Sequence, residues 1–231
     1  MLLELKGVSK TFAAVEGENA EVTVLKDITL SLDRGESVAV VAPSGGGKST
    51  LLSIAGLLLQ PTEGSVAIDG RDVTALPDDE RSALRARNIG FLFQHTQLIG
   101  SLRALENVLL PADFADVKAV RTAGQSQAES FDAIQQRAVE MMRDFGLEER
   151  MLHFPFQLSV GQKRRIATAR ALVLEPALII ADEPTNDLDG ENARRVVDAL
   201  FRRVEAGDAG LLLATHDPAL AQRADRIFEI G

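Results

Sequence analysis

Short apolar runs alternate along the chain with longer segments in which apolar residues recur at helical spacing. The runs predict buried strands, and the periodic segments predict amphipathic helices. A strand that is apolar throughout needs cover on both faces, so this alternation predicts a mostly parallel sheet between helices, the α/β class. The strands predicted for this sheet and its surroundings are residues 37–41, 64–69, 89–93, 178–181, 211–215 and 226–230. The predicted helices are residues 48–58, 78–87, 129–145, 159–174 and 190–204, with one more starting at 217.

Two parts of the chain depart from this alternation. Residues 2–12 and 22–32 alternate apolar with polar positions, which predicts an antiparallel hairpin joined by residues 13–21. Residues 120–130 are polar and rich in Gly, Gln and Ser, so we predict a loop there. The helix that follows should bury an apolar stripe, which is more typical of a core than of a cofactor site. The stripe consists of Phe131, Ile134, Ala138, Met141 and Phe145.

A glycine-rich turn follows the predicted strand 37–41. Residues 42–50 read Ala-Pro-Ser-Gly-Gly-Gly-Lys-Ser-Thr, the pattern of a phosphate-binding loop. Backbone N–H groups in such a loop can surround a phosphate, and the following helix adds its positive end. We expect Lys48 to reach the β- and γ-phosphates and the Ser49 hydroxyl to bind Mg²⁺. The expected phosphate-binding residues are Ser44, Gly45, Gly46, Gly47, Lys48, Ser49 and Thr50.

Polar residues follow three other predicted strands of the sheet. The carboxyl ends of parallel strands are where α/β proteins bind ligands. Asp182 can hold Mg²⁺ through water, and Glu183 can polarise a water that attacks the γ-phosphorus. Gln94 could touch the metal or that water, and a surface amide is its alternative. His216 could contact the γ-phosphate, and a structural histidine is its alternative.

A second anion site is predicted at residues 158–162, which read Leu-Ser-Val-Gly-Gln. Ser159 and Gln162 have the spacing of a capping box at the start of a helix, where free N–H groups attract anions. One triphosphate seldom needs two such sites within one chain. Two copies facing head to tail would use both, with ATP between Lys48 of one copy and Ser159 of the other.

Composition narrows the class of partner. The net charge of −9 and the sequence pI of about 4.9 argue against a nucleic-acid surface, so we expect no nucleic-acid partner. The absence of cysteine excludes disulfides and thiolate metal sites. No apolar run approaches the roughly 20 residues that span a bilayer, and no signal-peptide layout is present, so we expect a soluble chain.

With these motifs, the chain resembles the nucleotide-binding subunit of ATP-binding-cassette (ABC) transporters. In the family's terms residues 42–50 are the Walker A loop, Gln94 is the Q-loop glutamine and residues 158–162 are the signature. The resemblance implies a strand 178–183 carrying Mg²⁺-binding Asp182 and catalytic Glu183, and a switch histidine at His216. It further implies nucleotide contacts from Phe12, which would stack on adenine, and from Ser159, Gly161, Gln162 and the D-loop residue Asp189.

The same resemblance implies the domain organisation and the partners. We expect one ABC ATPase domain with a P-loop NTPase core, an antiparallel β-subdomain and an α-helical subdomain. Residues 1–94 and 175–231 would form the core with the β-subdomain, and residues 95–174 the helical subdomain. ATP and Mg²⁺ would be the cofactors. The partners would be a second copy in an ATP-sandwich dimer and an integral membrane permease, at the cytoplasmic face of the inner membrane.

Residues 91–94 and 104–111 are most similar to the macrolide-exporter and lipoprotein-release group of that family. The group implies export or extraction of amphiphilic cargo such as a drug, haem, a peptide or a lipoprotein. An alternative is an ATPase that pulls on a membrane partner to regulate cell-envelope enzymes without moving cargo. A soluble ABC protein of DNA repair or translation is disfavoured, because those usually carry two cassettes or long coiled-coil insertions.

Four features depart from the family pattern, and the first is Ala42, which replaces the usual first glycine of the phosphate-binding loop. Val160 replaces the first glycine of the usual Ser-Gly-Gly-Gln, and its side chain should crowd the partner's nucleotide and slow closure. Lys163 adds a positive charge just after the signature, and residues 112–133 are longer than the group suggests. We also expect residues 95–110 to form the docking wall for the permease, with Leu98 and Ile99 exposed on it.

Overall fold

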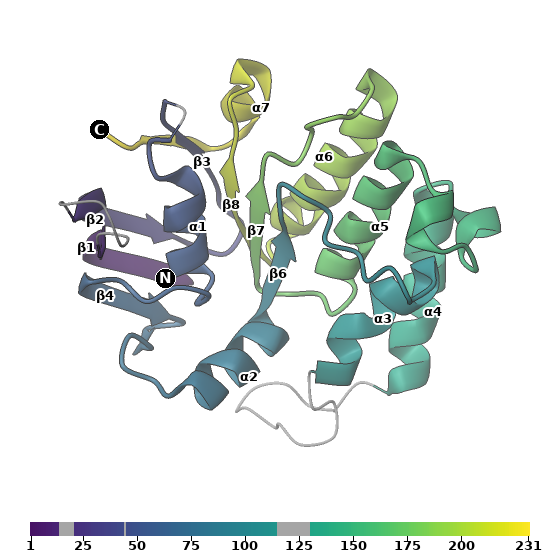
Figure 1. The fold of residues 1–231 in the computed structure, drawn as a ribbon, viewed down its shortest axis with the longest axis horizontal. Helices are drawn as coiled ribbons and strands as arrows, with labels where there is room; N and C mark the ends of the chain where they lie inside the picture. Colours follow the sequence, from purple (N-terminus) through teal and green to yellow (C-terminus); the bar gives the residue numbers. More distant parts are fainter. Residues whose placement is uncertain (14–20, 44, 115–129) are drawn as a thin grey trace.

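The computed structural model describes residues 1–13, 21–43, 45–114 and 130–231 (Figure 1). Its centre is a five-stranded parallel sheet with the strand order β6-β7-β8-β3-β9. The sheet and the helices on its two faces confirm the predicted α/β class. The strands are β3 (Ser37–Val41), β6 (Ile89–Leu92), β7 (Leu178–Asp182), β8 (Gly210–Ala214) and β9 (Arg226–Glu229).

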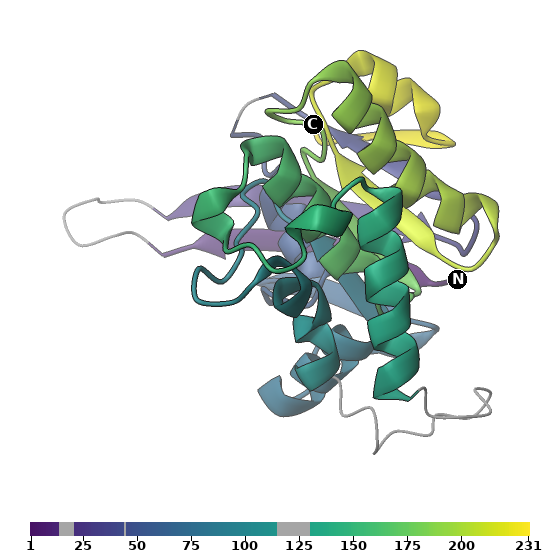
Figure 2. The same ribbon diagram turned by 90° about the vertical axis from the view of Figure 1, so that its right-hand side faces the viewer.

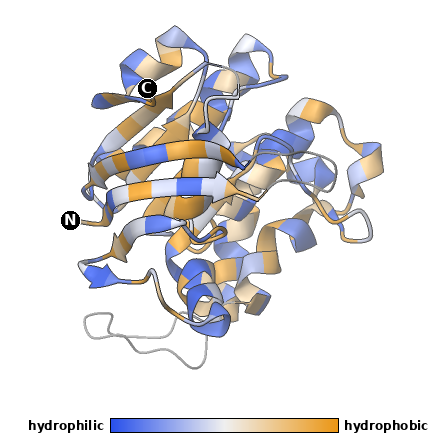
Figure 3. Cartoon of the chain, turned by 60° about the vertical axis from the view of Figure 1, so that its left-hand side comes forward, coloured by the Kyte–Doolittle hydropathy of each residue, from blue (hydrophilic) through white to orange (hydrophobic). Residues whose placement is uncertain are grey.

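A second, antiparallel sheet has the order β2-β1-β4-β5. Its strands are β1 (Leu3–Phe12), β2 (Val22–Leu32), β4 (Glu63–Ile68) and β5 (Arg71–Asp72). Apolar and polar residues alternate along β1 and β2, as Figure 3 shows by the alternation of orange and blue. The antiparallel pairing of β1 with β2 confirms the predicted hairpin. Most of the connecting segment lies outside the described residues.

Helix α1 (Lys48–Ala55) packs in the core that the two sheets share. Alternate residues of the parallel strands point to this side, including Val38, Ile180 and Leu212. The residues between them point to the opposite face and pack against helices α5 (Val160–Leu172), α6 (Gly190–Glu205) and α7 (Pro218–Arg223). The parallel sheet therefore has α1 on one face and α5 on the other.

Helices α3 (Ala104–Phe114), α4 (Phe131–Asp144) and α5 share a further core beyond the parallel sheet (Figure 2). Helix α5 contributes Ile166 to this core and Ala167 to the core under the sheet, so it joins the two. The remaining elements are α2 (Asp78–Asn88) and the short 3-10 helices η1 (Glu148–Arg150) and η2 (Pro155–Gln157). The division into a core and a helical subdomain at residues 95–174 stays a prediction.

Several predicted boundaries were wrong. Helix α1 ends at Ala55 and not at 58, because Gly56 caps it and Leu57 takes a left-handed conformation with φ of 60°. A side chain at Gly56 would lie 2.0 Å from the Phe91 ring, so the chain turns where the two segments touch. Helix α3 was not predicted, because Pro111 lies inside it and proline usually interrupts a helix.

The predicted stripe of α4 is correct only in part. Ile134, Ala138 and Phe145 are buried, but Phe131 is 46% exposed because it occupies the first helical position, at the end of α4. Met142, not Met141, is the fully buried methionine. The predicted loop at 120–130 lies almost entirely outside the described residues.

Candidate nucleotide site

The phosphate-binding loop joins the end of β3 to the start of α1. Gly45 and Gly47 have φ values of 77° and 87°, the left-handed region that favours glycine. A Cβ at Gly47 would lie 2.7 Å from a Leu25 methyl and 3.0 Å from the Val24 carbonyl oxygen. Glycine is therefore required both by the turn and by the packing beneath it. Ser44 lies outside the described residues.

Lys48 is the first residue of α1, and its side chain folds back over the loop. Its Nζ donates a hydrogen bond to the Ala42 carbonyl oxygen at 2.9 Å. This contact places the ammonium group beside the loop, where it can exchange a carbonyl for a phosphate oxygen. Thr50 follows two residues later in the same helix and is partly buried.

Ser49 and Asp182 meet although 133 residues separate them. The Ser49 hydroxyl donates to Asp182 Oδ2 at 2.7 Å, from the start of α1 to the end of β7. Burial raises the pKa of Asp182, as does the charge of Glu183, while the Ser49 hydrogen bond and Lys48 lower it. A hydroxyl and a partly buried carboxylate are hard oxygen ligands, the kind that Mg²⁺ prefers. The residues present therefore fit a Mg²⁺ ion.

Glu183 and His216 form the second pair at this edge. Glu183 is 7% exposed and takes a left-handed conformation with φ of 47°. Its Oε2 lies 2.8 Å from His216 Nδ1, and it also accepts the His216 backbone N–H at 3.3 Å. The Glu183 N–H donates to the Ala214 carbonyl at 2.9 Å, which fixes the unusual backbone against β8. The imidazole itself is largely exposed.

Gln94 lies just past the end of β6 and is exposed. Its backbone is held by a residue that the sequence analysis missed. Arg164 Nη1 donates to the Phe93 carbonyl at 2.6 Å, and Arg164 Nη2 donates to the Gln94 carbonyl. No sequence signal distinguishes this arginine from its neighbour Arg165, because the atoms it binds are backbone carbonyls in a distant segment.

The predicted capping box at the start of α5 is confirmed. The Ser159 side chain accepts the Gln162 N–H at 3.3 Å, and Gln162 Oε1 accepts the Ser159 N–H at 2.9 Å. Val160 is 56% exposed at the first position of the helix. Gly161 lies near α6, where an added Cβ would sit 3.6 Å from Asn192 and from Leu188. The helix start therefore presents Val160 to solvent, while the capping box satisfies the N–H groups of Ser159 and Gln162.

Phe12 and Asp189 lie on two other elements. Phe12 ends β1 and is 40% exposed, and Lys10 Nζ lies 5.2 Å from its ring centroid. Asp189 caps α6 by accepting the Asn192 N–H at 2.9 Å and its side-chain amide at 2.6 Å. These hydrogen bonds lower the pKa of Asp189. Asp189 therefore has a structural role as the cap of α6, and its contact with nucleotide stays a prediction.

The structure thus brings together only some of the predicted residues. The carboxyl edge of the parallel sheet collects Lys48, Ser49, Asp182, Glu183 and His216. Ser159, Gly161 and Gln162 lie instead at the start of α5, which packs on the other face of the sheet from α1. In the described part of the chain, no recorded hydrogen bond joins the signature to the phosphate-binding loop.

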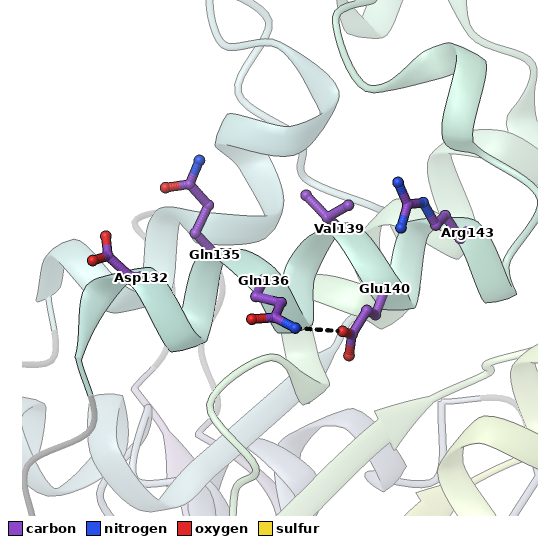
Figure 4. A pocket seen from close by; sticks show the side chains of 6 residues that line it. All are labelled: Asp132, Gln135, Gln136, Val139, Glu140 and Arg143. Carbon is purple, nitrogen blue, oxygen red and sulfur yellow. Dashed lines mark hydrogen bonds between the residues drawn. The ribbon is translucent and has the colours of Figure 1, made fainter.

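Two hollows lie away from this edge. One, of about 330 Å³, is lined by Val139 and polar residues on a single face of α4, where Gln136 donates to Glu140 at 3.0 Å (Figure 4). It includes none of the predicted site residues. The other, of about 700 Å³, lies among α2, β6, α3 and the end of α5. Its lining includes Arg85, Phe91, Phe93, Leu110, Phe114 and Arg170.

The fold and the site define a phosphate-loop nucleotide hydrolase. The family model described as ABC transporter matches residues 25–186. The chain belongs to the ABC transporter family, in which it is an ATPase cassette. Within the described residues, no helix is both long and apolar enough to cross a membrane.

Relatives of known name support the same family. The lipoprotein-releasing system ATP-binding protein LolD of Hyphomonas neptunium is 41% identical over 229 residues, covering 99% of this chain and 94% of LolD. The macrolide export ATP-binding/permease protein MacB of Photorhabdus laumondii is 42% identical over 229 residues. That match covers 99% of this chain but only 33% of MacB, so the chain spans about a third of that protein.

A solved structure has the same fold. The ATP-binding cassette MJ0796, a dimer in a post-hydrolysis state bound to ADP and Pi, matches with a TM-score of 0.87 and 37% identity. The match covers 99% of this chain and 94% of MJ0796. A second dimeric structure of MJ0796 matches equally well, with 39% identity.

Proposed function

We propose that two copies of this chain close head to tail around two ATP molecules and hydrolyse them with Mg²⁺. ATP hydrolysis by this dimer would drive a separate membrane permease. The observation that carries the proposal is the separation of the two anion-binding elements. Helices α1 and α5 pack on opposite faces of the parallel sheet, so the signature cannot complete the phosphate site of its own copy.

Nucleotide binding is assigned to the loop and to Phe12. The amides of residues 45–49 would surround the β-phosphate, and Lys48 would leave the Ala42 carbonyl for the β- and γ-phosphates. Phe12 is exposed at the end of β1, which leaves its ring able to stack on adenine. Thr50 would assist from the next position of α1.

Ser49, Asp182 and Gln94 would hold Mg²⁺, Asp182 through a water molecule. The ion, when bound, would neutralise charge on the phosphate oxygens. The Ser49–Asp182 hydrogen bond keeps these two oxygen donors together before any ion arrives. Because burial raises the pKa of Asp182, a nearby cation would favour its ionised form.

Glu183 would orient and deprotonate the attacking water, as a general base at the edge of the site. Its left-handed backbone directs the side chain toward His216, which would then contact the γ-phosphate. The hydrogen bond between the two side chains fixes the carboxylate before ATP binds. The partner copy would supply Ser159, Gly161 and Gln162 to the γ-phosphate, with Asp189 at the dimer contact.

The permease would dock in the 700 Å³ hollow and on the adjoining segment 95–110. The hollow combines half-buried aromatic and basic side chains with Phe114, which is 71% exposed. The MacB relative is named as an ATP-binding and permease protein in one chain, which supports a permease partner for this chain. The assembly would lie at the cytoplasmic face of the inner membrane and move amphiphilic cargo such as a drug, haem, a peptide or a lipoprotein.

Regulation of cell-envelope enzymes without cargo movement is the second candidate. The ATPase site and the permease hollow serve both functions equally. Measurement of cargo movement in vesicles containing the assembled complex separates them.

The composite site can be tested by mixing two inactive variants. Lys48→Ala removes the phosphate-binding lysine, and Ser159→Glu places a negative charge where the partner's γ-phosphate should lie. In a head-to-tail dimer, a mixed pair has one doubly defective site and one intact site. We expect the mixture to regain ATPase activity that neither variant has alone. Activity that stays at the sum of the two separate variants would overturn the head-to-tail arrangement.

A further inference from the structure

Arg164 is a charged residue inside the protein. Only 2% of its surface is exposed, which is uncommon for arginine. Two of its nitrogens donate to consecutive carbonyls, those of Phe93 and Gln94. Its Nε has no hydrogen-bond partner among the residues that the structure describes. The guanidinium is thus committed to one stretch of backbone and is not fully satisfied there.

The charges around Arg164 come from the catalytic edge of the sheet. Burial lowers the pKa of Arg164, and the carboxylates of Asp187 and Asp182 raise it. Arginine stays protonated under such conditions. Burying a charge with incomplete hydrogen bonding is a poor means of adding stability. The position therefore calls for a role other than stability.

A second arginine of α5, which is only half-buried, holds the same segment further on. Arg170 donates to the Thr96 carbonyl at 2.7 Å and to the Gln97 carbonyl at 2.9 Å. Arginines of helix α5 thus hydrogen-bond to the chain after β6 at two points, one at Gln94 and one beyond it. Helix α5 also begins at the signature, with Ser159 as its cap.

We infer that Arg164 is a positioning residue for catalysis, which fixes Gln94 in the nucleotide site and ties its position to the signature helix. The inference rests on the role proposed above for Gln94. Gln94 is exposed just past the strand end, so packing alone does not define where its side chain points. A bidentate guanidinium on the two carbonyls at this point limits rotation of the backbone there. Movement of α5 against a partner's nucleotide would then move Gln94 with it.

The test is a double-mutant cycle on the ATPase rate of the intact chain. Arg164→Met keeps an unbranched side chain and its helix propensity but is shorter and removes both donors. We expect kcat to fall about 10- to 100-fold, the cost of displacing a reacting group by about an ångström, with KM for ATP little changed. Gln94→Ala should lower kcat to a similar extent. The double variant should lose no more than Gln94→Ala alone, because Arg164 acts through Gln94.

Two further variants separate positioning from stability. Arg164→Lys keeps the charge but offers no planar pair of donors, so it should recover only part of the lost rate. Arg170→Met removes the half-buried arginine of the same helix and should lower the thermal midpoint by a comparable amount while retaining a much higher kcat. Hydrogen exchange of the amides at 93–97, without nucleotide, should be faster in Arg164→Met than in the wild type.

Each of the following results would overturn the inference. Additive losses in the double variant, or equal loss of kcat in Arg170→Met, would overturn the inference while leaving the proposed function intact. Wild-type activity in Gln94→Ala would overturn the proposed role of Gln94 and this inference together. Loss of kcat in Arg164→Met with no change in exchange at 93–97 would also overturn it.

Discussion

The carboxyl edge of the parallel sheet and the start of α5 are both proposed to bind the phosphates of ATP, but they differ in how complete they are. At the sheet edge, side chains from distant segments already touch, as Ser49 does Asp182 and Glu183 does His216. At the start of α5, the capping box satisfies only the helix itself, and Val160 faces solvent. Folding of one chain is enough to assemble the sheet edge, whereas the start of α5 needs contact with a second protein surface to complete a site.

The largest effect should come from Lys48→Ala at the sheet edge. Loss of the ammonium group would remove the charge proposed to neutralise the β- and γ-phosphates, so ATP binding and hydrolysis should both be lost. The fold should survive, because the recorded contact of the side chain is one hydrogen bond to a carbonyl. Titration calorimetry with ATP measures the first effect and circular dichroism the second. Unchanged affinity would remove the loop from the site.

Glu183→Gln should leave ATP binding intact but lower hydrolysis by about a thousandfold or more, because the attacking water loses its base. Because the bound ATP is not hydrolysed, residues 158–162 of each copy should stay bound to the nucleotide of the other copy. The variant should then elute as a dimer on a sizing column with ATP and as a monomer without it. Hydrolysis at the wild-type rate would show that another group acts as the base.

Ile99→Glu tests the segment 95–110, where the permease should dock. Ile99 is 41% exposed, and its backbone is held on both sides by the buried amide of Asn107, so the variant should stay folded. Co-purification with the membrane subunit should be lost. Leu98→Glu is not an equivalent test, contrary to the sequence-based expectation, because Leu98 packs against two cores and the charge should unfold the region. Normal assembly of Ile99→Glu would place docking elsewhere.

Val160→Gly should have a smaller effect, a rise in ATPase rate of about a few fold, or a tighter ATP dimer. The side chain is 56% exposed where the partner's nucleotide should lie, so its removal relieves crowding. Glycine has a helix propensity about 1 kcal/mol below that of alanine but only a few tenths of a kcal/mol below that of valine, so the stability loss should be small. Val160→Ala separates the two contributions. A lower rate with intact folding would mean that Val160 packs productively in the dimer.

Asp182→Asn should have a small effect on stability, and its sign is informative. Because burial raises the pKa of Asp182, its ionised form destabilises the folded chain at neutral pH. The variant should therefore melt a few degrees above the wild type at pH 7, although ATP hydrolysis is impaired. The difference should shrink as the pH falls toward about 4 and be absent below it, where both states of the wild type are protonated. A variant that melts lower at pH 7 would contradict the burial argument.

A feature could be predicted from the sequence when the residues that form it lie close together in the chain. The phosphate-binding loop and the capping box depend on residues within a few positions, and the capping box was predicted correctly. Helix α3 was missed because Pro111 argues locally against a helix that tertiary packing imposes. Arg164 was missed because its acceptors are backbone atoms, which leave no trace in the side-chain pattern.

The order of the strands has a consequence for synthesis of the protein. Strand β3 pairs with β8 and β9, so Val38 finds Leu212 and Arg226 only after nearly all of the described chain exists. Parallel pairings of such long range form slowly. While the ribosome is still making the middle of the chain, β3 has neither neighbour, and the loop that follows it has no rigid support. The nascent chain should therefore bind nucleotide only after β8 emerges.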